Sequence, residues 1–228
     1  MSWPTTTFFC TQCDFKQGDA RTWGTKEYVL DNGVRVPLDW RLGWCHDCKG
    51  LAAVEALSAE ECRKALSEAQ KTLSDMGPPP VRRWWQLHRF VFRGLWRKRV
   101  NDWMYSACQV EDARDALRLT EKRKNPPRCL ACGGSRVIAP LVTDRSEWAD
   151  SSKPKRTGFV HPGCGGEILM VMDGFRIGLR PSVRRYTPEG NFIGQEFVEG
   201  YSFPRGSYYD RCAWENIRIR GMAEPRAE

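Results

Sequence analysis

The chain of 228 residues is long enough for one large domain or two small ones, and 41% of its residues are hydrophobic. It contains no run of 18 apolar residues, which excludes a membrane-spanning helix, and its first residues lack the pattern of a secretory signal. The formal net charge of +8 is localised, because residues 77–128 alone sum to +8. Ten cysteines in a chain that we expect to be cytoplasmic favour metal binding or redox chemistry over disulfides.

The N-terminal segment contains two CxxC pairs, Cys10 with Cys13 and Cys45 with Cys48. Each pair places two sulfurs on one tight turn, and two such turns supply the four thiolates that tetrahedral Zn²⁺ binds. The residues between them predict two strands around the turn 31–33, the second continuing through 40–44 into the second pair. A thioredoxin-like redox motif is the alternative, but it requires a βαβ context. The order of knuckle, hairpin and knuckle over residues 8–50 resembles zinc ribbons, a fold type with many functions.

A second cluster repeats this spacing further along the chain. Cys129 and Cys132 are followed by two glycines, as are His161 and Cys164, and the glycines allow tight turns whose amides point at sulfur. Short strands are predicted at 137–142 and 157–160, with a polar loop at 143–156 between them. We therefore expect a second ribbon with three cysteines and one histidine, and Cys212 is the alternative fourth ligand. Four protein ligands leave no open position, so both zinc sites are predicted to be structural.

The middle of the chain predicts a helical hairpin. Ser58 and Glu61 form a capping-box pattern, which indicates one turn and then a helix from about Ala59 that ends at the 77–80 GPPP segment. A longer helix is predicted over 81–124, and its first 20 residues hold seven Arg or Lys and no acid. One face of this helix is apolar and is expected to pack on the first helix or a ribbon: Trp84, Trp85, Val91, Phe92, Leu95 and Trp96.

The cations of the same helix are either simply solvated or form a row that follows phosphates. The residues predicted to contact nucleic acid or a partner are Arg82, Arg83, Arg89, Arg93, Arg97, Lys98 and Arg99. Attachment of this helix to a membrane surface is a third, less favoured interpretation. Cys62 and Cys108 fall within the helical patterns and are expected to be buried or half-buried thiols.

The C-terminal part predicts strands at 167–172 and 175–180 and a hairpin at 182–197 around the turn 187–191. We expect these strands to extend the second ribbon and the tail to add an edge strand. The predicted fold class is α+β: a four-cysteine ribbon at 1–50, a helical hairpin at 51–127, and a ribbon with a β extension at 128–228.

No Walker-type loop, GxSxG or HExxH motif is present, and the three histidines, at 46, 88 and 161, are scattered. We therefore expect a non-enzymatic zinc protein that binds nucleic acid or docks on a nucleic-acid machine. The alternative is an adaptor that binds an acidic protein surface through its Trp/Arg helix and ribbons. A third hypothesis is redox sensing through a releasable zinc ion.

Overall fold

The computed structural model describes residues 2–19, 24–80, 93–138, 153–178, 182–197, 215–216 and 218–220. Within these ranges the chain forms two helices and strands in three sheets, which confirms the α+β class. Neither helix in the described part is apolar over enough of its length to span a membrane.

The chain folds into two units, each built from separate segments. The first, here called the β unit, comprises Met1–Lys26, Leu38–Leu57 and Asn125–Glu199. The second, here called the helical unit, comprises Glu27–Pro37, Ser58–Lys124 and Gly200–Glu228. The β unit is therefore interrupted twice along the sequence, the second time by the segment that carries both helices.

The first sheet of the β unit has the order β2-β1-β9-β8. Its strands are β1 (Ser2–Cys10), β2 (Lys16–Gly18), β8 (Lys155–Val160) and β9 (Glu167–Gly178). All neighbours are antiparallel, and β1 pairs with β9 so that Cys10 lies opposite Ile168. The two strands predicted at 167–172 and 175–180 are one strand, and its partner β1 adapts through a register shift between Pro4 and Thr6.

The second sheet has the order β6-β5-β7, with β5 (Trp40–Cys45), β6 (Gly50–Glu55) and β7 (Val137–Ile138). The expectation that a helical turn begins near residue 51 is wrong, because residues 50–55 form a strand that is buried along its whole length. Such a strand loses the alternating pattern and its Ala- and Leu-containing sequence reads equally well as helix. Gly43 of β5 is required here, since a Cβ atom would lie 2.9 Å from a Val54 methyl.

The core of the β unit lies between these two sheets. Phe8, Phe159, Ile168 and Met170 from the first sheet pack with a second set from β5 and β6: Leu42, Trp44 and Leu51. Burying each large apolar side chain contributes about 1.5–3 kcal/mol. This shared core holds the ends of β1, β5 and β8 in one region of the unit.

Both predicted hairpins are present, but the second strand of the first hairpin does not continue through residues 40–44, because it ends at Pro37 and Trp40–Cys45 form β5 in another sheet. Strands β3 (Thr25–Val29) and β4 (Arg35–Pro37) flank a turn with Gly33 at a φ of 81°, and β10 (Ser182–Tyr186) and β11 (Phe192–Phe197) flank a turn with Gly190 at 83°. Positive φ explains the glycine at both turns. The expectation that the β10–β11 hairpin extends the sheet of β8 and β9 is wrong, because this hairpin belongs to a different sheet.

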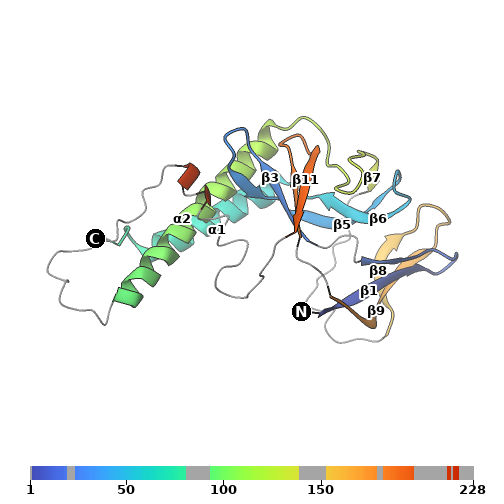
Figure 1. The fold of residues 1–228 in the computed structure, drawn as a ribbon. Coiled ribbons are helices and arrows are strands. Elements are labelled where there is room, and N and C mark those ends of the chain that lie inside the picture. Colours follow the sequence, from blue (N-terminus) through green and yellow to red (C-terminus); the bar gives the residue numbers. More distant parts are fainter. Residues whose placement is uncertain are drawn as a thin grey trace. The chain divides into compact units, whose positions relative to one another are not determined.

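The helical unit contains the predicted antiparallel hairpin, α1 (Ala59–Met76) and α2 (Arg93–Lys122), visible in Figure 1. The Ser58 side chain accepts a hydrogen bond from the Glu61 amide at 3.2 Å, so the predicted cap is confirmed. Helix α1 is capped at its C-terminal end by Gly77, whose φ is 75°. The carbonyl of Gly77 accepts a hydrogen bond from the Trp103 indole at 3.0 Å. At the other end, Cys62 Sγ lies 3.7 Å from the hydroxyl of Thr120.

The C-terminal tail was expected to add an edge strand, but its described residues 215–216 and 218–219 are helical. Arg220 there pairs with Asp112 at 2.9 Å and with Asp115 at 2.8 Å, and all three side chains are largely buried. The Cys108 thiol lies 3.5 Å from the same guanidinium. Desolvation by burial raises the pKa of Cys108 to about 12, so this cysteine stays a neutral thiol. The tail is thus fixed to α2 by charge.

Candidate metal centres

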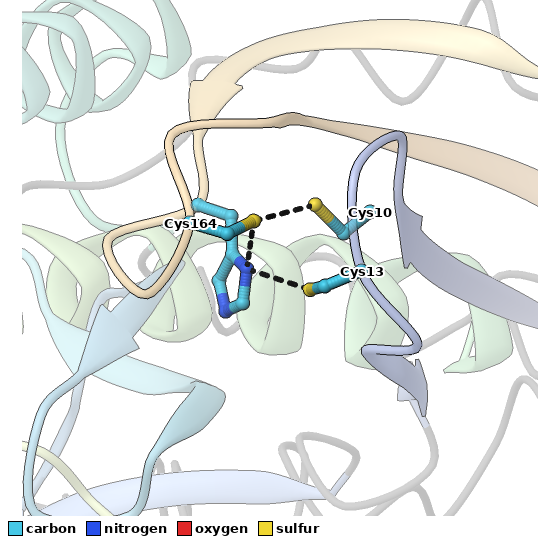
Figure 2. Close-up of side chains that lie close together, drawn as sticks. Cys10, Cys13 and Cys164 are labelled. Carbon is cyan, nitrogen blue, oxygen red and sulfur yellow. Dashed lines mark hydrogen bonds between the residues drawn. The ribbon is translucent and has the colours of Figure 1, made fainter.

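The first candidate centre, here called the histidine centre, joins two turns at one end of the first sheet. Cys10 and Cys13 lie where β1 ends, and His161 and Cys164 lie in the turn between β8 and β9. These turns meet because β9 is hydrogen-bonded to both β1 and β8. Figure 2 shows the sulfurs of Cys10, Cys13 and Cys164 converging on a common point.

The second candidate centre, here called the cysteine centre, joins the β5–β6 turn to the segment that precedes β7. It consists of Cys45, Cys48, Cys129 and Cys132. Cys45 is paired with Val137 in the sheet, and Val54 forms a bridge with Cys129, so backbone hydrogen bonds hold both turns together. In each centre all four ligand atoms lie within 4.8 Å of one another.

The distances within the cysteine centre match tetrahedral coordination, and those within the histidine centre are somewhat shorter, with the Cys10 and Cys164 sulfurs 3.3 Å apart. With Zn–S bonds of about 2.3 Å, two sulfurs on a tetrahedron are separated by about 3.8 Å, and a sulfur and an imidazole nitrogen by about 3.6 Å. In the cysteine centre, Cys45 and Cys132 are 3.6 Å apart and Cys48 and Cys129 are 3.7 Å apart. In the histidine centre, the Nδ1 atom of His161 lies 3.2 and 3.3 Å from the sulfurs of Cys164 and Cys13.

All eight residues expected to be metal ligands are therefore brought into two groups of four, but their grouping differs from the expected one. Cys10 and Cys13 join His161 and Cys164 rather than the pair at 45 and 48, and that pair joins Cys129 and Cys132. The physical reason is the strand pairing: β1 pairs with β9, more than 150 residues away, and β5 pairs with β7. Neither centre is contained in one contiguous segment. Cys212, the alternative ligand, lies outside the described residues.

Backbone amides point at ligand sulfurs, as we expected from the glycines that follow these residues. The Gly134 amide lies 3.4 Å from the Cys132 sulfur, and the Gln12 amide lies 3.4 Å from the Cys10 sulfur. Gly166 is required for a second reason, because a Cβ atom there would lie 2.6 Å from the sulfur of Cys10. Such amides stabilise negative charge on thiolates and fix their orientation.

The thiols of the histidine centre have unequal proton affinities. At Cys10 desolvation raises the pKa, but the amides of Gln12 and Cys13 and the Cys164 thiol outweigh it and lower the pKa to about 6. At Cys164 the Gly166 amide lowers the pKa, whereas the adjacent Cys10 sulfur and desolvation raise it to about 11. The two sulfurs lie 3.3 Å apart, so a negative charge on one of them disfavours ionisation of the other. A cation would allow both to ionise.

The cysteine centre shows the same division. Desolvation by burial raises the pKa of Cys129 to about 11 and also raises that of Cys48. At Cys132 desolvation is outweighed by the Gly134 amide and the neighbouring thiols, which lower the pKa. Four sulfurs this close cannot all be thiolates unless a cation is bound, and this donor set could hold such a metal ion.

His161 is a buried member of its centre, with 8% of its surface exposed. Its ring stacks on Phe15 with centroids 4.9 Å apart, and the edge of Trp44 approaches it at 4.8 Å. By contrast, His46 between the two N-terminal ligands of the cysteine centre is exposed, as expected for a bystander. Sequence spacing found His161 but not the two rings that orient it.

Two further residues support the cysteine centre and were not anticipated. Arg136 forms a salt bridge with Asp47, and its Nε atom lies 2.8 Å from the carboxylate. The carbonyl of Arg136 also accepts a hydrogen bond from the His46 amide at 3.0 Å. The two turns are therefore clamped side by side. Asp47 lies inside its CxxC motif, but no spacing rule pairs it with Arg136.

The residues predicted to contact nucleic acid or a partner are only partly described. Arg82, Arg83 and Arg89 lie outside the described residues, as do Trp84, Trp85, Val91 and Phe92 of the predicted apolar face. Arg93 and Arg97 lie on α2, and their side chains are outside the description, as are those of Leu95 and Trp96. Lys98 and Arg99 are exposed.

Comparison of the chain with protein-family models, with curated proteins and with solved structures gives no significant match.

Proposed function

We propose that this protein binds two zinc ions in structural, non-catalytic sites. The observation that carries the proposal is the presence of two four-ligand sets, of which the cysteine centre has the sulfur separations of a tetrahedral zinc site and the histidine centre is slightly more compact. Three cysteines with one histidine, and four cysteines, are both common structural zinc sets. Four protein ligands leave no position for a water or substrate, so neither site supplies zinc-hydroxide chemistry. The proposal includes a reducing, cytoplasmic environment, in which these thiols remain available.

Metal analysis of the purified chain tests this proposal. Two zinc ions per chain are expected, falling to one in the Cys132→Ser variant and one in the Cys164→Ser variant, both at exposed ligands. A matched control is Cys62→Ser, a cysteine of α1 outside either group. Four thiolates also bind a single iron ion, which would colour the protein red. Iron, or fewer than two metal ions, would contradict the proposal.

We further propose that the basic segment 81–100, of which residues 93–100 lie on α2, binds nucleic acid or docks on a nucleic-acid machine. Cations in the second half of α2 have partners within the helical unit: Arg114 pairs with Glu111, and Arg118 with Asp115 at 3.6 Å. Residues 81–100 contain seven cations and no acid, so positive charge is concentrated in this stretch of the sequence. Lys98 and Arg99, the described end of this run, are exposed. Cations about one helical turn apart can follow a phosphate backbone.

Titration with labelled duplex and single-stranded DNA and RNA at two salt concentrations tests this interface. Binding is expected to weaken steeply with salt, and the Lys98→Glu/Arg99→Glu variant should lower the logarithmic salt slope by about 2. The matched control is Lys64→Glu/Lys71→Glu, which reverses the same amount of charge at exposed positions of α1. Absence of binding at low salt, or an equal effect of both double variants, would refute the assignment.

An adaptor function is the second candidate, and one observation favours it. Strand β11 exposes the apolar side chains of Phe192, Ile193 and Phe197, each more than half exposed. Such side chains are more typical of a protein contact than of a phosphate contact. Co-purification with and without nuclease treatment separates the two candidates. A partner protein that stays bound after nuclease treatment, and is lost in a Phe192→Ser/Phe197→Ser variant, would favour the adaptor.

A further inference from the structure

The two metal centres are connected through one buried side chain, Trp44. Its backbone directly precedes Cys45, a ligand of the cysteine centre, and its ring lies against His161, a ligand of the histidine centre. The side chain is 5% exposed and belongs to the core of the β unit. Its ring has little freedom to move, since it also contacts the rings of Phe15 at 5.2 Å and Phe159 at 6.3 Å.

The ring of His161 contacts two aromatic side chains, one near each centre, and these two rings also contact each other. Phe15 stacks on it at an interplanar angle of 29° and lies two residues after the ligand Cys13. Trp44 approaches it edge-on at 65°. Stacked and edge-on aromatic pairs have a preferred geometry, so the orientation of one ring biases the orientation of its neighbour.

The backbone of Trp44 is equally well fixed. It lies opposite Leu51 of β6 and opposite Ile138 of β7, and these strands adjoin the two turns of the cysteine centre. A shift of the Trp44 ring therefore acts on the strand that carries Cys45. Because the interior is closely packed, such a shift costs free energy in the strand pairing of β5 with both β6 and β7.

We propose that Trp44 couples the two centres, so that zinc binding at either one strengthens zinc binding at the other. This inference rests on the proposed function. A metal ion on Nδ1 fixes the imidazole, the imidazole fixes the Trp44 ring, and the ring restricts the strand that presents the Cys45 thiolate. Coupling between binding sites is reciprocal, and its usual range is about 5- to 150-fold in affinity. A single ring contact places the expected value near the lower end, about tenfold.

The experiment measures zinc affinity at the cysteine centre with the histidine centre either filled or disabled. The histidine centre is disabled by Cys164→Ser, and zinc affinity is measured by competition with a chromophoric chelator. Cobalt(II) absorption distinguishes the two centres, because a four-sulfur site and a three-sulfur, one-nitrogen site absorb differently. We expect about tenfold weaker binding at the cysteine centre in Cys164→Ser, and the converse effect on the histidine centre in Cys132→Ser.

The role of Trp44 is tested by repeating both measurements in Trp44→Leu and Trp44→Phe backgrounds. The coupling should disappear in Trp44→Leu and largely survive in Trp44→Phe, which keeps an aromatic edge near His161. The matched control is Phe8→Leu, which removes another buried ring of the same core cluster. This variant keeps the rings of Phe15, Trp44 and His161. Circular dichroism reports whether each variant folds.

The outcomes separate the two levels of the proposal. An intact chain that binds two zinc ions with independent affinities would overturn the coupling and leave the proposed function standing. Loss of coupling in Phe8→Leu to the same extent as in Trp44→Leu would overturn the role of Trp44. If Trp44→Leu does not fold, the test rests on Trp44→Phe. A Trp44→Phe variant that folds normally but shows no coupling between the centres would refute a route through an aromatic edge. An intact chain with fewer than two zinc ions would refute both levels.

Discussion

Replacement of His161 tests most directly whether this residue is a metal ligand or a core histidine. Two substitutions give different expectations. His161→Ala removes the fourth ligand of the histidine centre and the ring that contacts both Phe15 and Trp44. His161→Cys removes the ring but supplies a thiolate, so the centre keeps four ligands. Comparison of the two variants separates coordination from packing.

The magnitudes follow from the coordination set and the ring contacts. Structural zinc sites bind with an apparent free energy of about 10–16 kcal/mol, so one ligand of four accounts for about 3 kcal/mol. Loss of that share weakens zinc binding on the order of a hundredfold. Each aromatic contact, at 4.9 and 4.8 Å, contributes about 0.5–1.5 kcal/mol, so both variants lose about 2 kcal/mol of packing energy.

The assay is zinc competition with a chromophoric chelator, combined with urea unfolding of the zinc-loaded chain. We expect His161→Ala to retain one tightly bound zinc ion and His161→Cys to retain two, with both unfolding at lower urea than the parent chain. His46→Ala is the matched control, because this exposed histidine lies between two ligands without being one. Unchanged zinc affinity at both centres in His161→Ala would show that the histidine only fills the core, and the tetrahedral interpretation would fail.

Three further predictions concern the scaffold. Ser58→Ala should destabilise the helical unit by about 1 kcal/mol in urea unfolding, and Ser58→Asp should not, because the capping oxygen is kept. Arg220→Ala should cost about 3 kcal/mol, because it leaves Asp112 and Asp115 largely buried without their cation; Arg220→Lys should restore part of this loss. Tyr186→Phe should cost about 1–3 kcal/mol, because the buried hydroxyl donates a 2.7 Å bond to a carbonyl in the cysteine centre. Burial raises the pKa of Tyr186 to about 12, so the stabilisation is complete below pH 10 and lost as the pH rises toward 12; a difference from Tyr186→Phe that grows over that range would refute the assignment.

Features set by neighbouring residues were predictable from the sequence. The eight candidate ligands were recognised as four pairs whose members are three positions apart. A tight turn is a local structure, so both donors of a pair can be read from a few consecutive residues. The cap of α1 at Ser58 and the glycines at positions 33 and 190 are equally local. Each of these predictions depends on fewer than six consecutive residues.

Strands whose burial depends on distant partners were harder to predict. Strand β6 is buried on both faces, so the alternation that marks a strand is absent from residues 50–55. Strand β1 includes the threonine run 5–7, which is buried where β1 pairs with β9, and Thr7 also pairs with β2. Polar residues at consecutive positions carry no strand period, and only the tertiary partner explains their burial.

The grouping of the ligands could not be predicted for a thermodynamic reason. Grouping ligands that are close in sequence costs less loop-closure entropy. Cys13 and Cys45 are separated by 32 positions, whereas Cys13 and His161 are separated by 148. The entropy of closing a loop grows only with the logarithm of its length, so the longer closure costs about 1.4 kcal/mol more. Burying a single Phe or Ile side chain contributes about 1.5–3 kcal/mol. The β1–β9 pairing buries Phe8, Ile168 and Met170 in one core, and that contribution exceeds the cost of the longer loop. The choice between the two groupings is therefore made by core residues that lie outside all four ligand motifs.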